Sequence, residues 1–164
     1  GYEVTLPKTL EGGKLTLAED LSDQTNSQNP DLGSGDTGYT GFYKDGSGTD
    51  QLLFAGVNSS ASDESSGRDM LDGMEQDSTT DVAVPRRDIT PDGAEDPLTC
   101  EVLTKEESGQ QLTMAVCAWG DNGSGGSVTD SGADALTADP ASVDLDAFAE
   151  RVDGIRDEVR VPAK

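Results

Sequence analysis

The chain has 164 residues, of which 33 are acidic, 11 are basic and none is histidine, so its net charge is −22. Such a negative field repels nucleic acids and anionic membrane surfaces, and we expect the domain to bind neither directly. Without histidine and with only two cysteines, a Ser-His-Asp triad, a Cys-His pair and a zinc site of four Cys and His ligands are all excluded.

The N-terminal part of the chain predicts short strands and a polar loop. Residues 3–10 alternate apolar and polar side chains around Pro7, as in an edge strand. Residues 14–21 predict a second short strand or the start of a helix. Residues 22–38 hold a single leucine, so they predict a polar loop that buries little surface.

A hairpin is predicted next, with arms at residues 39–44 and 51–57. The Asp-Gly pair at residues 45–46 favours the positive φ angles of its turn. The second arm is apolar throughout, which is typical of a central strand.

Residues 63–74 predict a short helix with two methionines and a leucine on one side. Residues 75–97 contain three prolines and many acidic side chains, so they predict an irregular connector. The basic pair in this connector, Arg86 and Arg87, is expected to neutralise nearby acidic residues at the surface.

Two further strands are predicted at residues 98–104 and 111–119. A two-residue turn at residues 108–109 places Cys100 opposite Cys117 in a pair whose side chains approach closely. We therefore predict a disulfide bond between them, with two reduced thiols as the alternative. A bond that closes a loop of this length is worth about 3 kcal/mol in the chain-entropy model, and it indicates an oxidising compartment.

Residues 120–141 predict a polar loop that contains a brief strand through Val128. Residues 143–162 then predict the clearest helix of the chain, which Asp144 or Ser142 caps at its start. Its apolar side chains recur at helical spacing: Leu145, Phe148, Ala149, Val152, Ile155 and Val159.

Together these elements predict an α+β fold for a single extracytoplasmic domain that spans residues 1–164. We expect an antiparallel sheet of about five strands, with a C-terminal amphipathic helix and a shorter helix packed on one face. Polar loops are expected near residues 22–38, 75–97 and 120–141. The hydrophobic fraction of 32% limits the core, in which Trp119 should pack near the disulfide bond.

Two loops rich in Asp are candidate calcium sites, because hard cations prefer carboxylate and carbonyl oxygens. The first is at residues 45–50, and the second is the Gly-rich loop that follows Trp119. Neither has the ligand spacing of an EF-hand, so turns at the edge of the sheet are the competing interpretation. No other cofactor is indicated. The candidate ligands are Asp45, Asp50, Asp121, Asn122, Asp130 and Asp134.

Three segments carry a resemblance to known proteins: residues 2–13, residues 54–57, and a C…CxWxD pattern that runs from Cys100 to Asp121. The chain resembles the extracytoplasmic domains of actinobacterial, Streptomyces-type proteins of unknown function that are membrane-anchored or secreted. The resemblance extends over most of the chain and supports export and the disulfide bond. It implies no activity.

We therefore expect a non-enzymatic domain, extracellular or in the cell envelope on the outer side of the cytoplasmic membrane. Its partner would be an envelope protein or another ligand of unknown identity. One alternative is a calcium-dependent binding module, and another is a hydrolase built on paired carboxylates. We also expect a signal peptide or an N-terminal anchor in the longer protein, and the sequence leaves the oligomeric state open.

Overall fold

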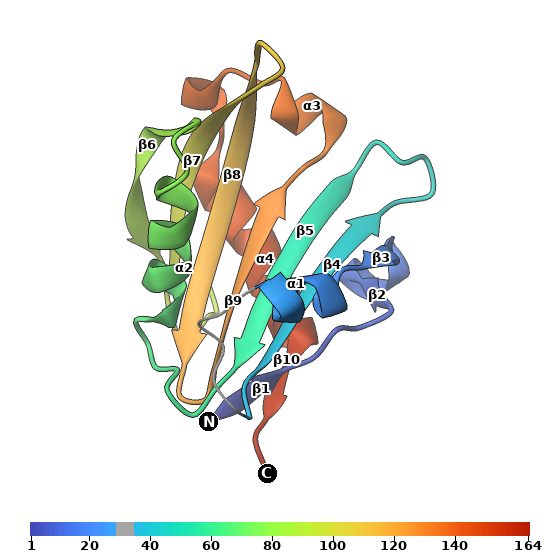
Figure 1. Ribbon diagram of the computed structural model, residues 1–164, viewed down its shortest axis with the longest axis vertical. Coiled ribbons are helices and arrows are strands. Elements are labelled where there is room, and N and C mark those ends of the chain that lie inside the picture. The colour runs from blue at the N-terminus through green and yellow to red at the C-terminus, as the bar shows by residue number, and fades with distance from the viewer. Residues whose placement is uncertain (29–34) are drawn as a thin grey trace.

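Residues 1–28 and 35–164 are described by the computed structural model, and they form an α+β fold. Eight antiparallel strands build one sheet in the order β2-β3-β4-β5-β9-β8-β7-β6, while β1 and β10 pair separately (Figure 1). The strands are β1 (Tyr2–Val4), β2 (Thr9–Leu10), β3 (Leu15–Asp20), β4 (Thr37–Lys44), β5 (Gln51–Asn58), β6 (Thr80–Ile89), β7 (Leu98–Glu107), β8 (Gln110–Asp121), β9 (Ser124–Asp130) and β10 (Arg160–Pro162).

Four α-helices and two short 3-10 turns complete the described residues. The helices are α1 (Ser22–Gln28), α2 (Ser66–Glu75), α3 (Ala133–Leu136) and α4 (Leu145–Val159), and the 3-10 turns are Glu11–Gly13 and Pro140–Ser142. Helices α2 and α4 confirm the two predicted helices, and α1 is an addition inside the predicted loop at residues 22–38. The part of that loop at residues 29–34 lies outside the described residues.

The prediction of about five strands is too low, because the main sheet alone has eight. Residues 75–97 are not an irregular connector: they include β6, which pairs with β7 through two irregularities in register. As an outer strand, β6 tolerates Pro85, whose missing amide would break a ladder in the middle of a sheet. The brief strand predicted through Val128 is confirmed as β9, which has seven residues and pairs with both β5 and β8.

The predicted hairpins are confirmed. Strands β4 and β5 are the arms of the first, and β7 and β8 pair in the predicted register with Cys100 opposite Cys117. The two cysteines form a disulfide bond. Ser108 and Gly109 supply the turn, with φ angles of 53° and 78°. The Gly-rich segment after Trp119 is a hairpin as well, because β8 turns directly into β9.

Helices α2 and α4 pack on opposite faces of the sheet, so the prediction that both helices pack on one face is wrong (Figure 1). Successive side chains of a strand point to opposite faces. Cys100, Cys117 and Trp119 belong to the core cluster that includes α4, whereas Leu103 and Val116 belong to a smaller cluster with α2. The continuous apolar run of β8 is explained by burial on both sides.

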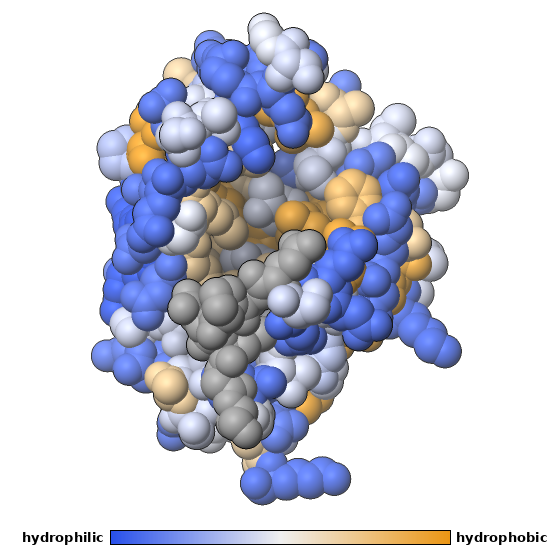
Figure 2. Space-filling view, viewed as in Figure 1, coloured by the Kyte–Doolittle hydropathy of each residue, from blue (hydrophilic) through white to orange (hydrophobic). Residues whose placement is uncertain are grey.

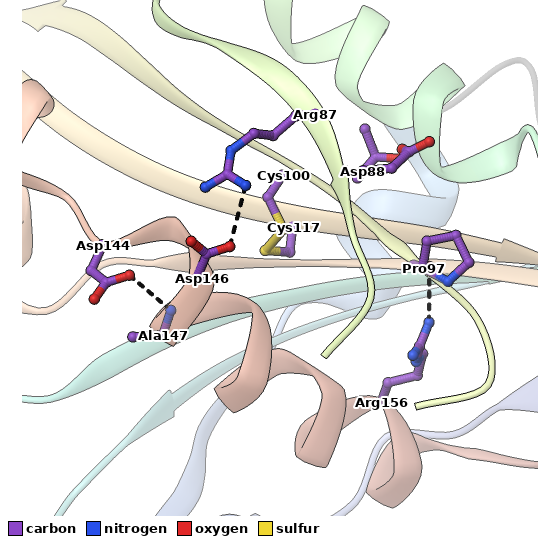
Figure 3. The surroundings of a disulfide bond; sticks show 10 residues. Arg87, Asp88, Pro97, Cys100, Cys117, Asp144, Asp146, Ala147 and Arg156 are labelled. Carbon is purple, nitrogen blue, oxygen red and sulfur yellow. Dashed lines mark hydrogen bonds and ion pairs between the residues drawn. A yellow bond between two sulfur atoms is a disulfide. The ribbon is translucent and has the colours of Figure 1, made fainter. Parts of the chain in front are cut away.

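Helix α4 packs on the face that carries the disulfide bond (Figure 3). Its predicted cap is confirmed, since the Asp144 carboxylate accepts a hydrogen bond from the amide of Ala147 at 3.0 Å. Near the other end, the buried Arg156 side chain donates hydrogen bonds to the carbonyl oxygens of Asp96 and Pro97. These bonds join α4 to the start of β7.

Helix α2 packs on β8 with its backbone almost in contact at the N-terminal end. A Cβ atom added to Gly67 would lie 2.7 Å from the backbone nitrogen of Trp119. A Cβ atom on Gly120 would clash with the carbonyl oxygen of Asp63. Glycine is therefore required on both sides of this contact, and Gly67 fixes the position of the helix.

Candidate functional site

The described residues cover the sheet face next to α2 only in part, and the part that they leave open is apolar. Leu53, Ala55 and Val57 of β5 are half-buried there, because Leu52 and Phe54 alternate with them and point into the opposite core. Figure 2 shows a hollow on this side of the molecule, with apolar surface at its floor and hydrophilic residues above it and to its left.

Two adjoining hollows lie beside α2, with volumes of about 260 Å³ and about 490 Å³, and Gly73 borders both. We call them together the α2 groove. All three methionines of the chain line the groove, and methionine side chains adapt readily to different ligand shapes. Its apolar lining is Leu53, Ala55, Val57, Met70, Met74, Leu103, Met114 and Val116.

The opposite border of the groove is formed by α1, which polar contacts attach to β4. The Thr25 hydroxyl donates to the Thr40 hydroxyl at 2.7 Å. The Asn26 side chain donates to the Gly38 carbonyl and accepts from the Gly38 amide, both at 2.9 Å. Because α1 has almost no apolar residues to bury, these bonds account for its position, and Thr25 reaches the groove.

Acidic side chains from α2 and the residues after it border the groove. Asp69 lines the larger hollow and Asp77 lines the smaller one. Hydrogen bonds from the hydroxyl and the amide of Thr79 hold the pKa of Asp77 below its usual value, so this carboxylate is charged at neutral pH. Lys105 also lines the groove, and its ammonium group lies 3.7 Å from Asp77.

Beneath α2 lies a cluster of one arginine and three carboxyl groups. Arg86 of β6 donates to Asp72 at 2.9 Å and to Glu75, both on α2. Glu101 of β7 has no exposed side-chain surface, and its nearest oxygen lies 4.0 Å from Nε of Arg86. The expected neutralising role of Arg86 is confirmed, as is that of Arg87, which pairs with Asp146 at 3.2 Å.

The structure brings three of the six candidate calcium ligands to one small hollow. Asp50, Asp130 and Asp134 line it together. Asp50 already forms an ion pair with Arg151 at 2.9 Å, and Asp130 accepts a hydrogen bond from the amide of Gly132. Burial raises the pKa of the Asp130 carboxyl group.

The other three candidates lie elsewhere. Asp45 accepts hydrogen bonds within its own turn, from the hydroxyl of Ser47 and the amide of Asp50. Asp121 and Asn122 lie at the far end of β9 from Asp130, and Asp121 pairs with Arg160 at 3.0 Å. Within residues 1–28 and 35–164, no three His, Cys, Asp or Glu side chains are close enough together to hold a metal ion.

A hydrolase built on two carboxylates would need them in a cleft that a substrate reaches. Glu101 and Glu75 are neighbours, and burial raises the pKa of Glu101, but Glu101 is fully enclosed between α2 and the sheet. Sequence reasoning did not identify either the α2 groove or Glu101. The available signals were the methionines grouped on one helix side and a single acidic residue inside the apolar run of β7.

None of the helices in the described part of the chain is long and apolar enough to cross a membrane. No protein-family model, curated protein or solved structure matches the chain.

Proposed function

We propose that this chain is a non-enzymatic binding domain of the cell envelope, and that its α2 groove holds a cationic, amphipathic segment of a partner protein. The observation that carries the proposal is the half-open sheet face beside α2. It is apolar, it is lined by every methionine of the chain, and it lies in a molecule of net charge −22. Apolar hollows of this kind commonly mark interaction sites.

The shape and lining of the groove favour an amphipathic segment. A helix laid in a groove inserts apolar side chains that recur every three or four residues, and methionines can repack around them. Leu53, Ala55 and Val57 form a row along β5, and Met70 and Met74 face this row from α2. An apolar stripe on a partner would cover the β5 row and the two methionines together.

The charges favour a cationic partner. Asp69 and Asp77 stand at the border of the groove, and Lys105 is the one basic residue in its lining among the described residues. The negative field of the whole domain attracts basic segments and accelerates their encounter. The negative charge of the domain would repel an acidic segment.

The test uses an acetylated helical peptide of about 18 leucine and lysine residues with one apolar side. Isothermal titration calorimetry should show saturable binding by the domain. A scrambled peptide of the same composition has the same charge without an apolar side, so it should bind at least tenfold more weakly. Equal binding of both peptides would mean that only net charge is recognised, and the proposal would be wrong.

Variants locate the binding surface. Leu53→Gln and Met70→Gln should each weaken binding of the amphipathic peptide by about tenfold, since each removes an apolar contact worth about 1–2 kcal/mol. Val82→Gln is the matched control, because Val82 is a 44% exposed apolar residue on β6, outside the groove. If Val82→Gln weakens binding and the groove variants do not, the peptide binds elsewhere.

A further inference from the structure

Glu101 is a buried carboxyl group whose nearest side-chain neighbour on α2 is another carboxyl group, Glu75. Its side chain lies on the α2 face of β7 and has no exposed surface. Within the described residues, no N–H or O–H group donates a hydrogen bond to either of its carboxyl oxygens when Glu101 is ionised. An ionised carboxylate in such a place is costly unless it is paired and hydrogen-bonded.

The charged groups that face Glu101 come from two of the three elements packed against it. β6 contributes Arg86, with Nε at 4.0 Å, and α2 contributes Glu75 and Asp72. β8 contributes no charge, since the residue opposite Glu101 is Val116. Among the described residues, the guanidinium group of Arg86 is therefore the one positive charge near three carboxyl groups, and its hydrogen bonds go to the two on α2 rather than to Glu101.

This arrangement favours neutral Glu101. Burial is the largest cause that raises its pKa, to about 7. A hydrogen bond from the neutral acid to Glu75 and the negative charge of Glu75 act in the same direction. Arg86 opposes these effects, but its hydrogen bonds go to the helix. Glu101 therefore changes its charge near neutral pH, which is rare for a glutamate.

We propose that the proton on Glu101 is a switch for the α2 groove: neutral Glu101 lets the C-terminal half of α2 lie against the sheet, and ionised Glu101 loosens it. When the proton leaves, three carboxylates surround one guanidinium group. The repulsion is relieved when the end of α2 carrying Glu75 moves outward and water reaches Glu101. The N-terminal end stays fixed, because Gly67 packs on the backbone of β8.

The groove depends on the part of α2 that moves. Met70, Gly73 and Met74 line it, and all three follow Gly67 along the helix. If the partner binds only the closed arrangement, its binding is linked to one proton. Affinity should then fall by up to about tenfold between pH 6 and pH 8. This last step rests on the proposed function, whereas the movement of α2 does not.

The movement is tested on the free protein by NMR of methionine methyl groups labelled with ¹³C. In the native protein, the Met70 and Met74 signals should shift with pH around a midpoint near 7. In Glu101→Gln, whose side chain resembles the neutral acid, they should stay at their low-pH positions. Glu107→Gln is the matched control, because Glu107 is an exposed residue on the same strand, and it should titrate like the native protein.

Flat methyl signals in the native protein between about pH 5.5 and pH 8.5, or an unchanged titration in Glu101→Gln, would overturn the switch. If Glu101→Gln does not fold, the carboxyl carbon of Glu101 is followed in the native protein instead. It must titrate together with Met74, and any separation of the two midpoints beyond error rejects the proposal.

The leucine–lysine peptide tests the link to binding. Its affinity for the native domain should decrease from pH 6 to pH 8, whereas Glu101→Gln should keep the low-pH affinity throughout. Parallel pH dependence in the two proteins would reject the link. If the peptide binds at no pH, the proposed function fails, but the methyl titration still decides whether Glu101 controls α2.

Discussion

At the level of single residues, the two glycines of α2, Gly67 and Gly73, differ in whether the fold requires them. Gly67 touches the backbone of Trp119, whereas a Cβ atom on Gly73 would have no neighbour within 4 Å. Alanine generally favours a helix over glycine by about 1 kcal/mol. That gain should appear only where the added methyl group has space.

We therefore expect Gly73→Ala to raise the free energy of unfolding by about 0.5–1 kcal/mol. Gly67→Ala should lower it by about 1–3 kcal/mol, since the methyl group would push α2 away from β8. Urea denaturation of both variants provides the comparison. If both substitutions are stabilising, the close contact between α2 and β8 is not present in solution.

Glu101 should also give the stability of the domain a particular pH dependence. Its pKa is about 7 in the folded protein and about 4.5 in an unfolded chain, so the folded state binds more protons between these values. The stabilisation is complete below pH 4.5 and is lost as pH rises through 7, a change of about 3 kcal/mol.

Glu101→Gln removes this contribution to the pH dependence. The difference in unfolding free energy between Glu101→Gln and the native protein should therefore increase from about pH 4.5 to about pH 7.5 and then level off. Denaturant titrations at several pH values measure it. A difference that stays constant with pH would mean that the pKa of Glu101 is the same in the folded protein as in the unfolded chain.

At the level of secondary-structure elements, one buried side chain joins α4 to the β6–β7 connection. Arg156 is 1% exposed, and it bonds the Asp96 carbonyl at 3.0 Å and the Pro97 carbonyl at 3.2 Å. It also pairs with Asp153 of the same helix at 2.8 Å. These bonds give partners to buried polar groups that would otherwise have no hydrogen bond.

Arg156→Ala should lower the free energy of unfolding by about 3 kcal/mol, because it leaves these groups unpaired and creates a cavity. Arg156→Met keeps much of the side-chain volume without the donors, so its loss should be intermediate. Chemical denaturation distinguishes the two effects. An Ala variant as stable as the native protein would show that water replaces the guanidinium group at little cost.

The elements that could be predicted from the sequence are those with a local signal. The Asp-Gly turn between β4 and β5 and the two cysteines in β7 and β8 each determine a register from nearby residues alone. In contrast, β6 is a strand only because β7 lies beside it, and α1 is held mainly by bonds from Thr25 and Asn26 to β4.

The same reasoning explains why the candidate site was not foreseen. Met70 and Met74 share one side of a short predicted helix, but Met114 lies in a distant strand. The groove exists only because α2 lies across a sheet built from distant segments. Grouping both helices on one face was wrong for a related reason. The run around Trp119 is apolar on both sides, but a strand pattern does not show which helix covers which side.

At the level of the whole molecule, the net charge of −22 should make stability depend on salt. Sodium chloride screens repulsion between the carboxylates, so the midpoint of thermal unfolding should rise with concentration. Calcium chloride at matched ionic strength should raise the midpoint by the same amount as sodium chloride. Asp50, which lines the candidate calcium hollow, is already paired with Arg151.

The measurement is thermal unfolding without reductant, in sodium chloride, in calcium chloride and with a chelator. A rise of several degrees with calcium alone, at sub-millimolar concentration, would contradict the expectation and indicate specific binding. The variant Asp130→Asn would then show whether the hollow shared by Asp50, Asp130 and Asp134 is the site.

The pairing of β1 with β10 also bears on how the domain responds to mechanical force. Tyr2 lies opposite Pro162, and the amide of Ala163 donates to the carbonyl of Gly1 at 3.0 Å, so the chain enters and leaves at one place. Tension applied through both ends would load these hydrogen bonds one after another, as in a zipper. In single-molecule stretching, this short ladder should open first and at low force, before tension reaches the eight-stranded sheet.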